Sequence, residues 1–505
     1  MTQAREVLRG LTKKHTRLVN EVSELMMATV EAANGVSEVQ VLVLECTQYA
    51  QTHPELTLNA DGSVTYHVVV PTNWSVATPD GPSSADAQNS KTRSAANELE
   101  KLVAKALARA VEVDEAYGKR LDALTNGTYT CVETSGTHSP GLPNQPQAGW
   151  SPTQVAFWWA SLTQAEKQAI ITEHPEWIGN LDGIDMASRS QANLNRLPVE
   201  LAAAQAEYDR FIKDRREWMK KNGIREYPEE DQMENAKNKL DDLKKIQENL
   251  TSHPDRSLLL LDTSGPKQVR AAVATGDVDT ADHVATFVPG MGATPDSKLD
   301  KYAGNVQRLK EHMDNASNGT CAAIAWFGYD APAGFLEPGW TDVLTTETAR
   351  EGAVSLNSFT EGINASRAAS GGTGPHQTLL GHSYGSTTAG IAASSARAGI
   401  ISSLIMFGSP GSGVQDVREY NLAPGHAYVS AVDSHDWVQG SGSIVADGFG
   451  VDPVDLDGVI HISGNVPEPD GYGWMLNPGG RHDTYMDEGS PALEDMAKVA
   501  AGVYQ

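Results

Sequence analysis

The sequence has few cysteines, few basic residues and no long apolar run, and each shortage excludes a class of protein. The three cysteines, Cys46, Cys131 and Cys321, are too few for a disulfide framework and form no CxxC zinc pair. We therefore expect reduced thiols; the alternative is a single disulfide bond. Lys and Arg number 39 against 65 Asp and Glu, and the net charge of −26 argues against nucleic acid as a partner. The apolar runs are shorter than the roughly 18 residues of a membrane-spanning helix, so we expect no transmembrane segment.

The N-terminal stretch MTQAREVLRGLTKKHTRLVNE lacks the apolar core of a signal peptide. We therefore expect a cytoplasmic protein, or one that is exported without a cleavable signal peptide. The 505 residues suffice for two or three domains.

Residues 1–130 show apolar residues at helical spacing on both sides of an alternating stretch, LTLNADGSVTYHVVV. This pattern predicts a helical hairpin-like domain with a small β-hairpin that turns at Asp61-Gly62. No residue here suggests chemistry, so the expected roles are binding of a partner protein, self-association or export. Residues 131–150 are rich in Gly, Pro, Ser and Thr and are predicted to be a linker.

Residues 151–255 are predicted to be helical, with helix starts at Ser151 and Thr163. Trp158, Trp159 and Trp177 have two interpretations: a lipid-binding face, or anchors that pack these helices together. We favour the second, because aromatic side chains mostly fill cores and interfaces. This section is therefore expected to pack on the domain that follows it.

Residues 256–505 alternate short aliphatic runs with helix-like stretches. The runs are SLLLLD, AAVAT, HVATFVP, CAAIAWFGY, TLLGHS, SLIMFGSPG, HAYVSAV and VIHIS. Buried strands that alternate with helices predict an α/β domain, with a mostly parallel sheet covered by helices on both faces.

One motif in this domain carries chemistry. Gly381-His382-Ser383-Tyr384-Gly385 matches G-x-S-x-G between a predicted strand and a helix of small residues. In a nucleophile elbow the serine sits on a strained turn, and the glycines two positions away avoid clashes with that turn. We predict that Ser383 is a nucleophile; the alternative is a plain structural turn.

A serine nucleophile needs a base, and the base needs an acid that orients it. In chain order the acid follows the serine and the histidine comes last. Asp436, after the run HAYVSAV, is our preferred acid and Asp433 the alternative. His482, in the loop NPGGRHDTYMD before the final helix, is our predicted base, since His461 lies inside a strand and His435 is too close to the acid.

An oxyanion hole needs two backbone N–H groups near the nucleophile. One is expected from Tyr384, the residue after Ser383. For the other we choose Met291, in the loop Pro289-Gly290-Met291-Gly292 that follows an earlier strand, with a simple strand-ending turn as the alternative.

The ordered motifs VATFVPGMG, AAIAWFGYDAP, LLGHSYGSTTAG, MFGSPGSGV and RHDTYMD resemble a largely uncharacterised α/β-hydrolase family of actinobacteria. The resemblance covers about residues 150–505 and implies the α/β-hydrolase fold and a triad of Ser383, His482 and Asp436. Members of that family often carry helical N-terminal regions like the WXG-type modules of type VII secretion. Residues 1–130 are similar in character but contain no Trp-x-Gly.

The sequence thus predicts a serine hydrolase acting on a small-molecule or lipid ester, with no cofactor. The alternative from another class is a secreted effector or interaction protein that uses the hydrolase fold as a scaffold. A metal enzyme is a third possibility, because Asp433, His435 and Asp436 lie close in sequence. Asp452, Asp455 and Asp457 do so too, but neither group has a recognisable metal-site spacing.

Overall fold

The residues that the computed structural model describes divide into two units, Met1–Ser135 and Gly136–Gln505. The described residues are 53–68, 84–126, 145–147, 149–223, 226–334, 340–432, 436, 438, 448–464 and 481–504, with isolated positions between 25 and 50. Most of the predicted linker lies outside these residues, as does Cys131, so both stay predictions.

In the first unit the described residues form a long helix and a small β-hairpin. Helix α2 spans Ser84–Thr125, and strands β1 (Leu56–Leu58) and β2 (Val64–Tyr66) pair antiparallel. The Asp61 carboxylate accepts hydrogen bonds from the Ser63 N–H and hydroxyl at 3.0 and 2.6 Å, which closes the turn between the strands. One cluster of buried residues in this unit consists of Cys46, Leu56, Ala96, Leu99, Val103 and Ala106.

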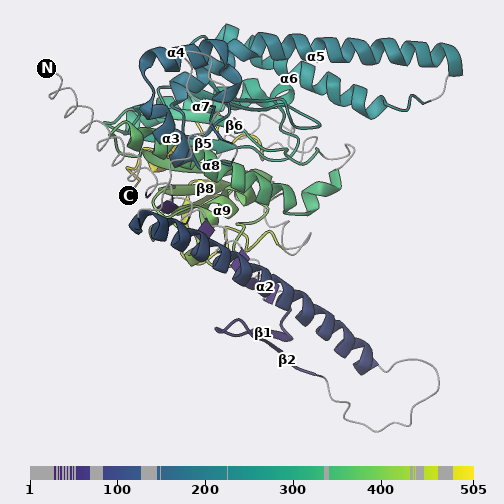
Figure 1. The fold of residues 1–505 in the computed structure, drawn as a ribbon, viewed down its shortest axis with the longest axis vertical. Helices are drawn as coiled ribbons and strands as arrows, with labels where there is room; N and C mark the ends of the chain where they lie inside the picture. The colour runs from purple at the N-terminus through teal and green to yellow at the C-terminus, as the bar shows by residue number, and fades with distance from the viewer. Residues whose placement is uncertain are drawn as a thin grey trace. The chain divides into compact units, whose positions relative to one another are not determined.

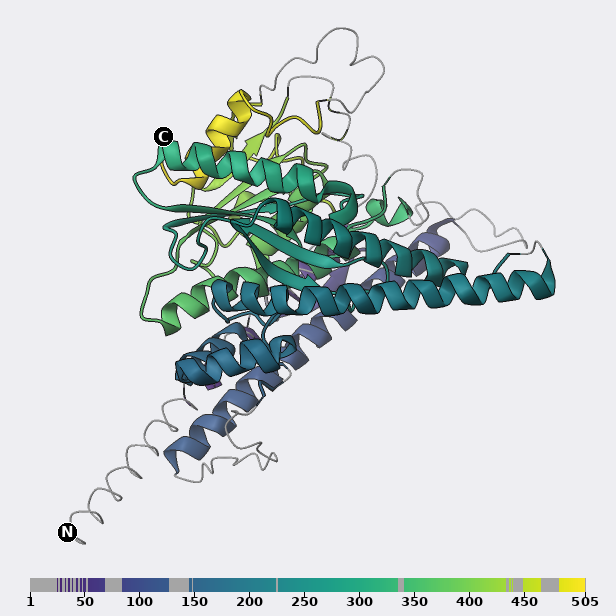
Figure 2. The ribbon, with the colours of Figure 1, turned by 90° about the horizontal axis from the view of Figure 1, so that it is seen from above.

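The second unit begins with helices. They are α3 (Pro152–Ser161), α4 (Gln164–Glu173), the short 3-10 helix η1 (Pro175–Trp177), α5 (Met186–Asn222) and α6 (Glu230–Ser252). Capping boxes at Ser151 and Thr163 begin α3 and α4, because each side chain accepts the backbone N–H three residues on. Trp159 is 3% exposed, and its indole N–H donates to Asp185 at 2.6 Å, so it packs α3 against the start of α5. α5 and α6 lie side by side (Figures 1 and 2).

An eight-stranded sheet follows. Its strands are β3 (Arg256–Asp262), β4 (Arg270–Thr275), β5 (His283–Val288), β6 (Cys321–Phe327), β7 (His376–His382), β8 (Ser403–Phe407), β9 (Ala427–Ser430) and β10 (Ile460–Ile462). The order across the sheet is β10-β9-β8-β7-β5-β6-β4-β3. Neighbours pair in parallel from β10 to β6, and β4 runs antiparallel to both β6 and β3.

Helices cover both faces of this sheet. α6, α7 (Pro295–Ala316) and α12 (Pro491–Ala500) pack on one face, and α8 (Glu347–Ala369) and α9 (Tyr384–Ser395) pack on the other. Two short 3-10 helices, η2 (Trp340–Leu344) and η3 (Val417–Glu419), complete the elements. All seven residues of β6 are buried, which is why this strand is apolar throughout rather than alternating. The predicted α/β architecture, mostly parallel and covered on both faces, is confirmed.

Residues before the sheet cover its edge strand β3, beyond which no further strand pairs in the part of the chain that the structure describes. The Asn180 side chain donates to Leu261 O at 2.7 Å and accepts from Leu261 N at 2.9 Å, as a partner strand would. The Ser190 hydroxyl accepts from Leu258 N at 3.0 Å, and Asn193 donates to Leu258 O at 3.2 Å. In the described part of the chain, no helix is both long and apolar enough to cross a bilayer.

Candidate active site

Ser383 occupies a strained turn between β7 and α9. Its backbone angles are φ 56° and ψ −133°, and among the described residues it is the one non-glycine with positive φ. Such angles are costly for a residue with a Cβ, and they persist where the surrounding structure enforces them. Here Ser383 N–H donates to Phe407 O of the neighbouring strand at 3.1 Å, and Ser386 N–H closes the turn by donating to Ser383 O at 2.9 Å.

The two glycines of the motif are required by close packing around this turn. A Cβ on Gly381 would lie 2.4 Å from the Cα of Ser386, and one on Gly385 would lie 2.2 Å from Val288 O. Both distances are too short for any side chain. The spacing of G-x-S-x-G therefore has the steric origin that the sequence suggests.

The turn lies where the sheet changes winding direction. From β5 the chain crosses through α7 to β6 on one side, and it then returns through α8 to β7 on the other side of β5. In open α/β sheets, ligands bind beyond the carboxyl ends of the strands at such a switch point. The loop after β5 lies against Ser383 there, because a Cβ on Gly290 would lie 3.0 Å from Ser383 Oγ. Met291 is the next residue of that loop, and Tyr384 is the first residue of α9.

Asp436 and His482 are in direct contact. His482 Nδ1 lies 2.9 Å from Asp436 Oδ1 and 3.0 Å from Oδ2. The carboxylate side chain is fully buried, whereas the imidazole keeps 14% of its surface exposed. Burial by itself would raise the pKa of Asp436, but hydrogen bonds and the proximity of His482 outweigh it and lower the pKa. The Asp436 carboxylate is therefore ionised at neutral pH and can hold the His482 ring in one orientation.

Two further groups hold the carboxylate in place. The Tyr485 hydroxyl donates to Asp436 Oδ2 at 3.0 Å, and Val438 N–H donates to Oδ1 at 3.0 Å. With the contacts to His482, each oxygen of the buried carboxylate is hydrogen-bonded, as a buried charge requires.

Asp436 and His482 lie at the end of β8, the strand next to β7 in the sheet. A Cβ on Gly408, the residue after Phe407, would lie 2.8 Å from Cε1 of His482 and 3.2 Å from Oδ2 of Asp436. Among the hydrogen bonds of the described residues, none joins Ser383 Oγ to His482. Hydrogen bonds between catalytic groups are often long without substrate and shorten in the complex.

The remaining candidates fall elsewhere. Asp433 and His435 lie outside the described residues. His461 lies in the middle of β10 with its side chain exposed. Asp452 accepts the Val454 N–H at 3.0 Å within a turn, and the described residues contain no group of three metal-ligating side chains.

Comparison with known proteins identifies the family. Residues 264–446 match a family model described as "Alpha/beta hydrolase". The uncharacterized protein Rv0963c of Mycobacterium tuberculosis is 36% identical over 239 residues, which make up 45% of this chain and 84% of that protein. The chain belongs to the α/β-hydrolase family.

Further proteins match parts of this α/β-hydrolase. The uncharacterized protein Rv2079 of Mycobacterium tuberculosis is 30% identical over 403 residues, 72% of this chain, and the chain spans 58% of the length of that relative. A dienelactone hydrolase from Anabaena variabilis matches 50% of the chain and 97% of its own at 13% identity and a TM-score of 0.29. A carboxyl esterase from Bacillus coagulans matches 31% of the chain and 45% of its own at 17% identity and a TM-score of 0.20.

The sequence of this α/β-hydrolase gave no role to two residues that the structure brings to the site. Tyr485 donates a hydrogen bond to Asp436 from a position three residues after His482, and nothing in the stretch RHDTYMD indicates this contact. His382 donates a hydrogen bond to the main chain of His482, although it is 100 residues away in sequence. Its place beside Ser383 is the one signal that could have drawn attention to it.

Proposed function

We propose that this α/β-hydrolase is a serine hydrolase that cleaves carboxylic esters of small molecules or lipids. The observation that carries the proposal is the pairing of buried Asp436 with His482 beside a strained serine at the switch point of the sheet. A buried acid that orients a histidine next to a serine is the arrangement that activates a serine hydroxyl.

In the proposed reaction, Ser383 Oγ attacks the ester carbonyl carbon while its proton passes to His482 Nε2. Asp436 accepts the Nδ1–H bond throughout and stabilises the imidazolium that forms. The tetrahedral intermediate then expels the alcohol, which takes the proton from His482, and leaves an acyl group on Ser383. Water repeats the sequence with His482 as base, releasing the carboxylic acid and restoring the free hydroxyl.

The negative charge of each tetrahedral intermediate requires preorganised N–H donors. We assign this role to the backbone N–H groups of Tyr384 and Met291. The first N–H groups of a helix have no acceptor within the helix, which leaves that of Tyr384 available for a ligand. The closeness of Gly290 to Ser383 Oγ supports a donor from the adjacent position in the loop.

A series of p-nitrophenyl esters with acyl chains of increasing length tests the proposal and sorts small-molecule from lipid substrates. We expect hydrolysis by the purified full chain and none by the Ser383→Ala variant. Equal rates for the two proteins would contradict the mechanism. Absence of hydrolysis by both proteins would favour the alternative in which the fold serves as the scaffold of an effector or interaction protein.

A further inference from the structure

His382, the residue before the nucleophile, lies in an enclosed aromatic environment at the end of β7. Its side chain is 5% exposed. The ring centroid lies 6.3 Å from that of Phe287, 5.1 Å from that of Phe407 and 4.6 Å from that of His482. These contacts leave the imidazole little freedom to rotate. Its position on β7 is therefore fixed by packing.

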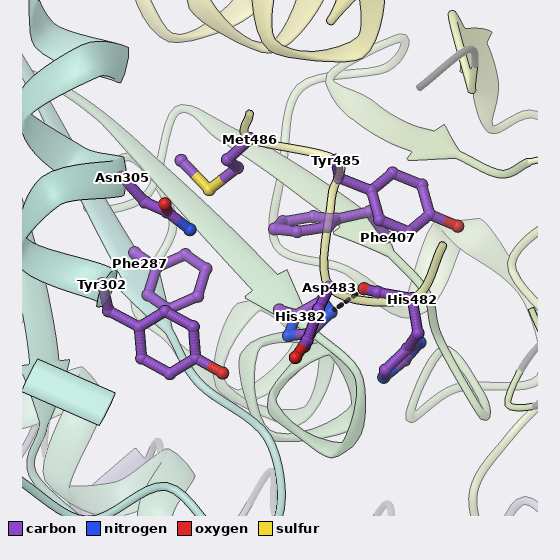
Figure 3. A pocket seen from close by; sticks show the side chains of 9 residues that line it. All are labelled: Phe287, Tyr302, Asn305, His382, Phe407, His482, Asp483, Tyr485 and Met486. Carbon is purple, nitrogen blue, oxygen red and sulfur yellow. Dashed lines mark hydrogen bonds between the residues drawn. The ribbon is translucent and has the colours of Figure 1, made fainter. Parts of the chain in front are cut away.

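The His382 ring is hydrogen-bonded from Nε2 to the backbone carbonyl oxygen of His482, at 2.7 Å (Figure 3). A carbonyl oxygen can only accept, so Nε2 carries a proton. Burial lowers the pKa of His382 to about 3, with the nearby His482 as a second cause. At neutral pH the ring is therefore uncharged, with its single proton on Nε2.

Helix α7 holds the same loop from the other side. Lys301 and Lys298 lie 3.0 and 3.6 Å from the Asp483 carboxylate, and Arg308 donates to Met486 O at 3.1 Å. Burial by itself would raise the pKa of Asp483, but the proximity of His382 and of the two ammonium groups outweighs it and lowers the pKa. These contacts fix residues on the C-terminal side of His482, not the main chain of His482 itself.

The loop fits closely into the space between β7 and α7. His382, Asp483 and Tyr302 line a cavity of about 10 Å³ there (Figure 3). This volume is about that needed for one water molecule, so the loop has little room to shift while the hydrogen bond from His382 is in place.

Resting on the proposed function, we propose that His382 is a positioning residue for the catalytic base. Its Nε2–H holds the main chain of His482 at a fixed place relative to Ser383, the residue that directly follows β7. One hydrogen bond thus links the strand that carries the nucleophile directly to the loop that carries the base. Because a misplacement of about 1 Å can cost about 100-fold in rate, the loss of this bond should affect catalysis more than substrate binding.

Two variants of His382 in the full chain test the proposal. His382→Met introduces an apolar side chain of similar length and removes the N–H donor. His382→Gln keeps an N–H donor at the same number of bonds from Cα as Nε2. With a p-nitrophenyl ester, we expect His382→Met to lose about 10- to 100-fold in kcat with KM changed less than about 2-fold, and His382→Gln to recover most of that loss.

The matched control is His376→Met, at the opposite end of β7, which should keep the wild-type kcat. The inference would be overturned if His382→Met kept the wild-type kcat, or if His382→Met and His382→Gln were both folded and lost activity equally. Either result would leave the proposed function in place. An inactive wild-type protein would overturn the proposed function and this inference with it.

A measurement on the unaltered protein covers the case in which His382→Met does not fold. Nitrogen-15 NMR of ring-labelled histidines, with His382 assigned by its absence in His382→Gln, should show a neutral ring protonated on Nε2 from pH 8 to pH 5. A proton on Nδ1, or titration of this ring near pH 6.5, would overturn the inference.

Discussion

Replacement of Asp436 by asparagine removes the charge of the acid while keeping the size of its side chain. Both carboxylate oxygens face Nδ1 of His482, at 2.9 and 3.0 Å. In the variant, one of them becomes an NH₂ donor that meets the Nδ1–H donor. The ring can relieve this contact by carrying its proton on Nε2, and it then lacks the lone pair that should receive the proton of Ser383.

The expected loss is large. Amidation of a triad aspartate costs about 10⁴-fold in kcat, or about 5 kcal/mol of transition-state stabilisation at 1.36 kcal/mol for each tenfold. Steady-state hydrolysis of a p-nitrophenyl ester measures it, and KM should change little because Asp436 does not contact substrate in the proposed mechanism. Tyr485→Phe is the matched control, since it removes one hydrogen bond to the same carboxylate but leaves the charge. It should lose no more than about tenfold.

The refuting result involves Asp433, the alternative acid from the sequence. Asp433→Asn should retain near wild-type kcat. If Asp433→Asn loses several orders of magnitude and Asp436→Asn does not, the contact between Asp436 and His482 is not the catalytic one. The assignment of Ser383 and His482 would survive that outcome.

Three further predictions concern the nucleophile, a buried carboxyl group and the domain organisation. Ser383→Ala should lose ester hydrolysis with an unchanged circular dichroism spectrum. Ser355→Ala, at an exposed position on α8, should keep the activity. Retained activity in Ser383→Ala would contradict the assignment of the nucleophile. Burial raises the pKa of Asp242, which accepts two backbone N–H groups, to about 7. Because the folded value exceeds the unfolded one, protonation stabilises the fold as the pH falls from about 7 towards 4. Urea titrations of the wild type and of Asp242→Asn measure this effect. As the pH falls from 7 to 5, the difference between their free energies of unfolding should change in favour of the wild type by about 1.4 kcal/mol per pH unit. A difference that does not change with pH would refute the raised pKa. A fragment that starts at Gln147 should stay folded and active, whereas one that starts at Pro254 should aggregate because it exposes the edge of β3. Light scattering and ester hydrolysis are measured for both fragments. A soluble and active shorter fragment would show that residues 151–255 are a separate module.

The strands of the sheet could be predicted because a buried strand has a short apolar sequence that can be recognised locally. β6 is buried along its whole length, and its sequence CAAIAWF is apolar throughout. The elbow at Ser383 could be predicted for a similar reason, since its two glycines answer steric demands within a few residues. Short-range physics of this kind is visible in a single sequence.

The order of the strands depends on pairing between distant segments and could not be read in the same way. The segment between β3 and β4 is too short for a parallel crossover, which implies an antiparallel pair. Nothing in the sequence indicates that β4 then pairs with β6, or that β5 lies between β6 and β7. The switch point that places the loop of Met291 beside Ser383 follows from that order.

The supporting residues of the site were missed for the same reason. His382 and Tyr485 act on groups 100 and 49 residues away in sequence, and such contacts have no local signature. The roles of the Tyr384 and Met291 amides stay predictions. So does the binding of a partner protein or a second copy by residues 1–130.

The central claim is that Ser383 is an activated nucleophile, and covalent labelling by a fluorophosphonate probe tests it most directly. The purified full chain, treated with the probe and digested, should yield one modified peptide by mass spectrometry, with the phosphonate on Ser383. Ser383→Ala and heat-denatured wild type should remain unlabelled. Absence of labelling in folded wild-type protein, or labelling at another serine that persists in Ser383→Ala, would contradict the claim.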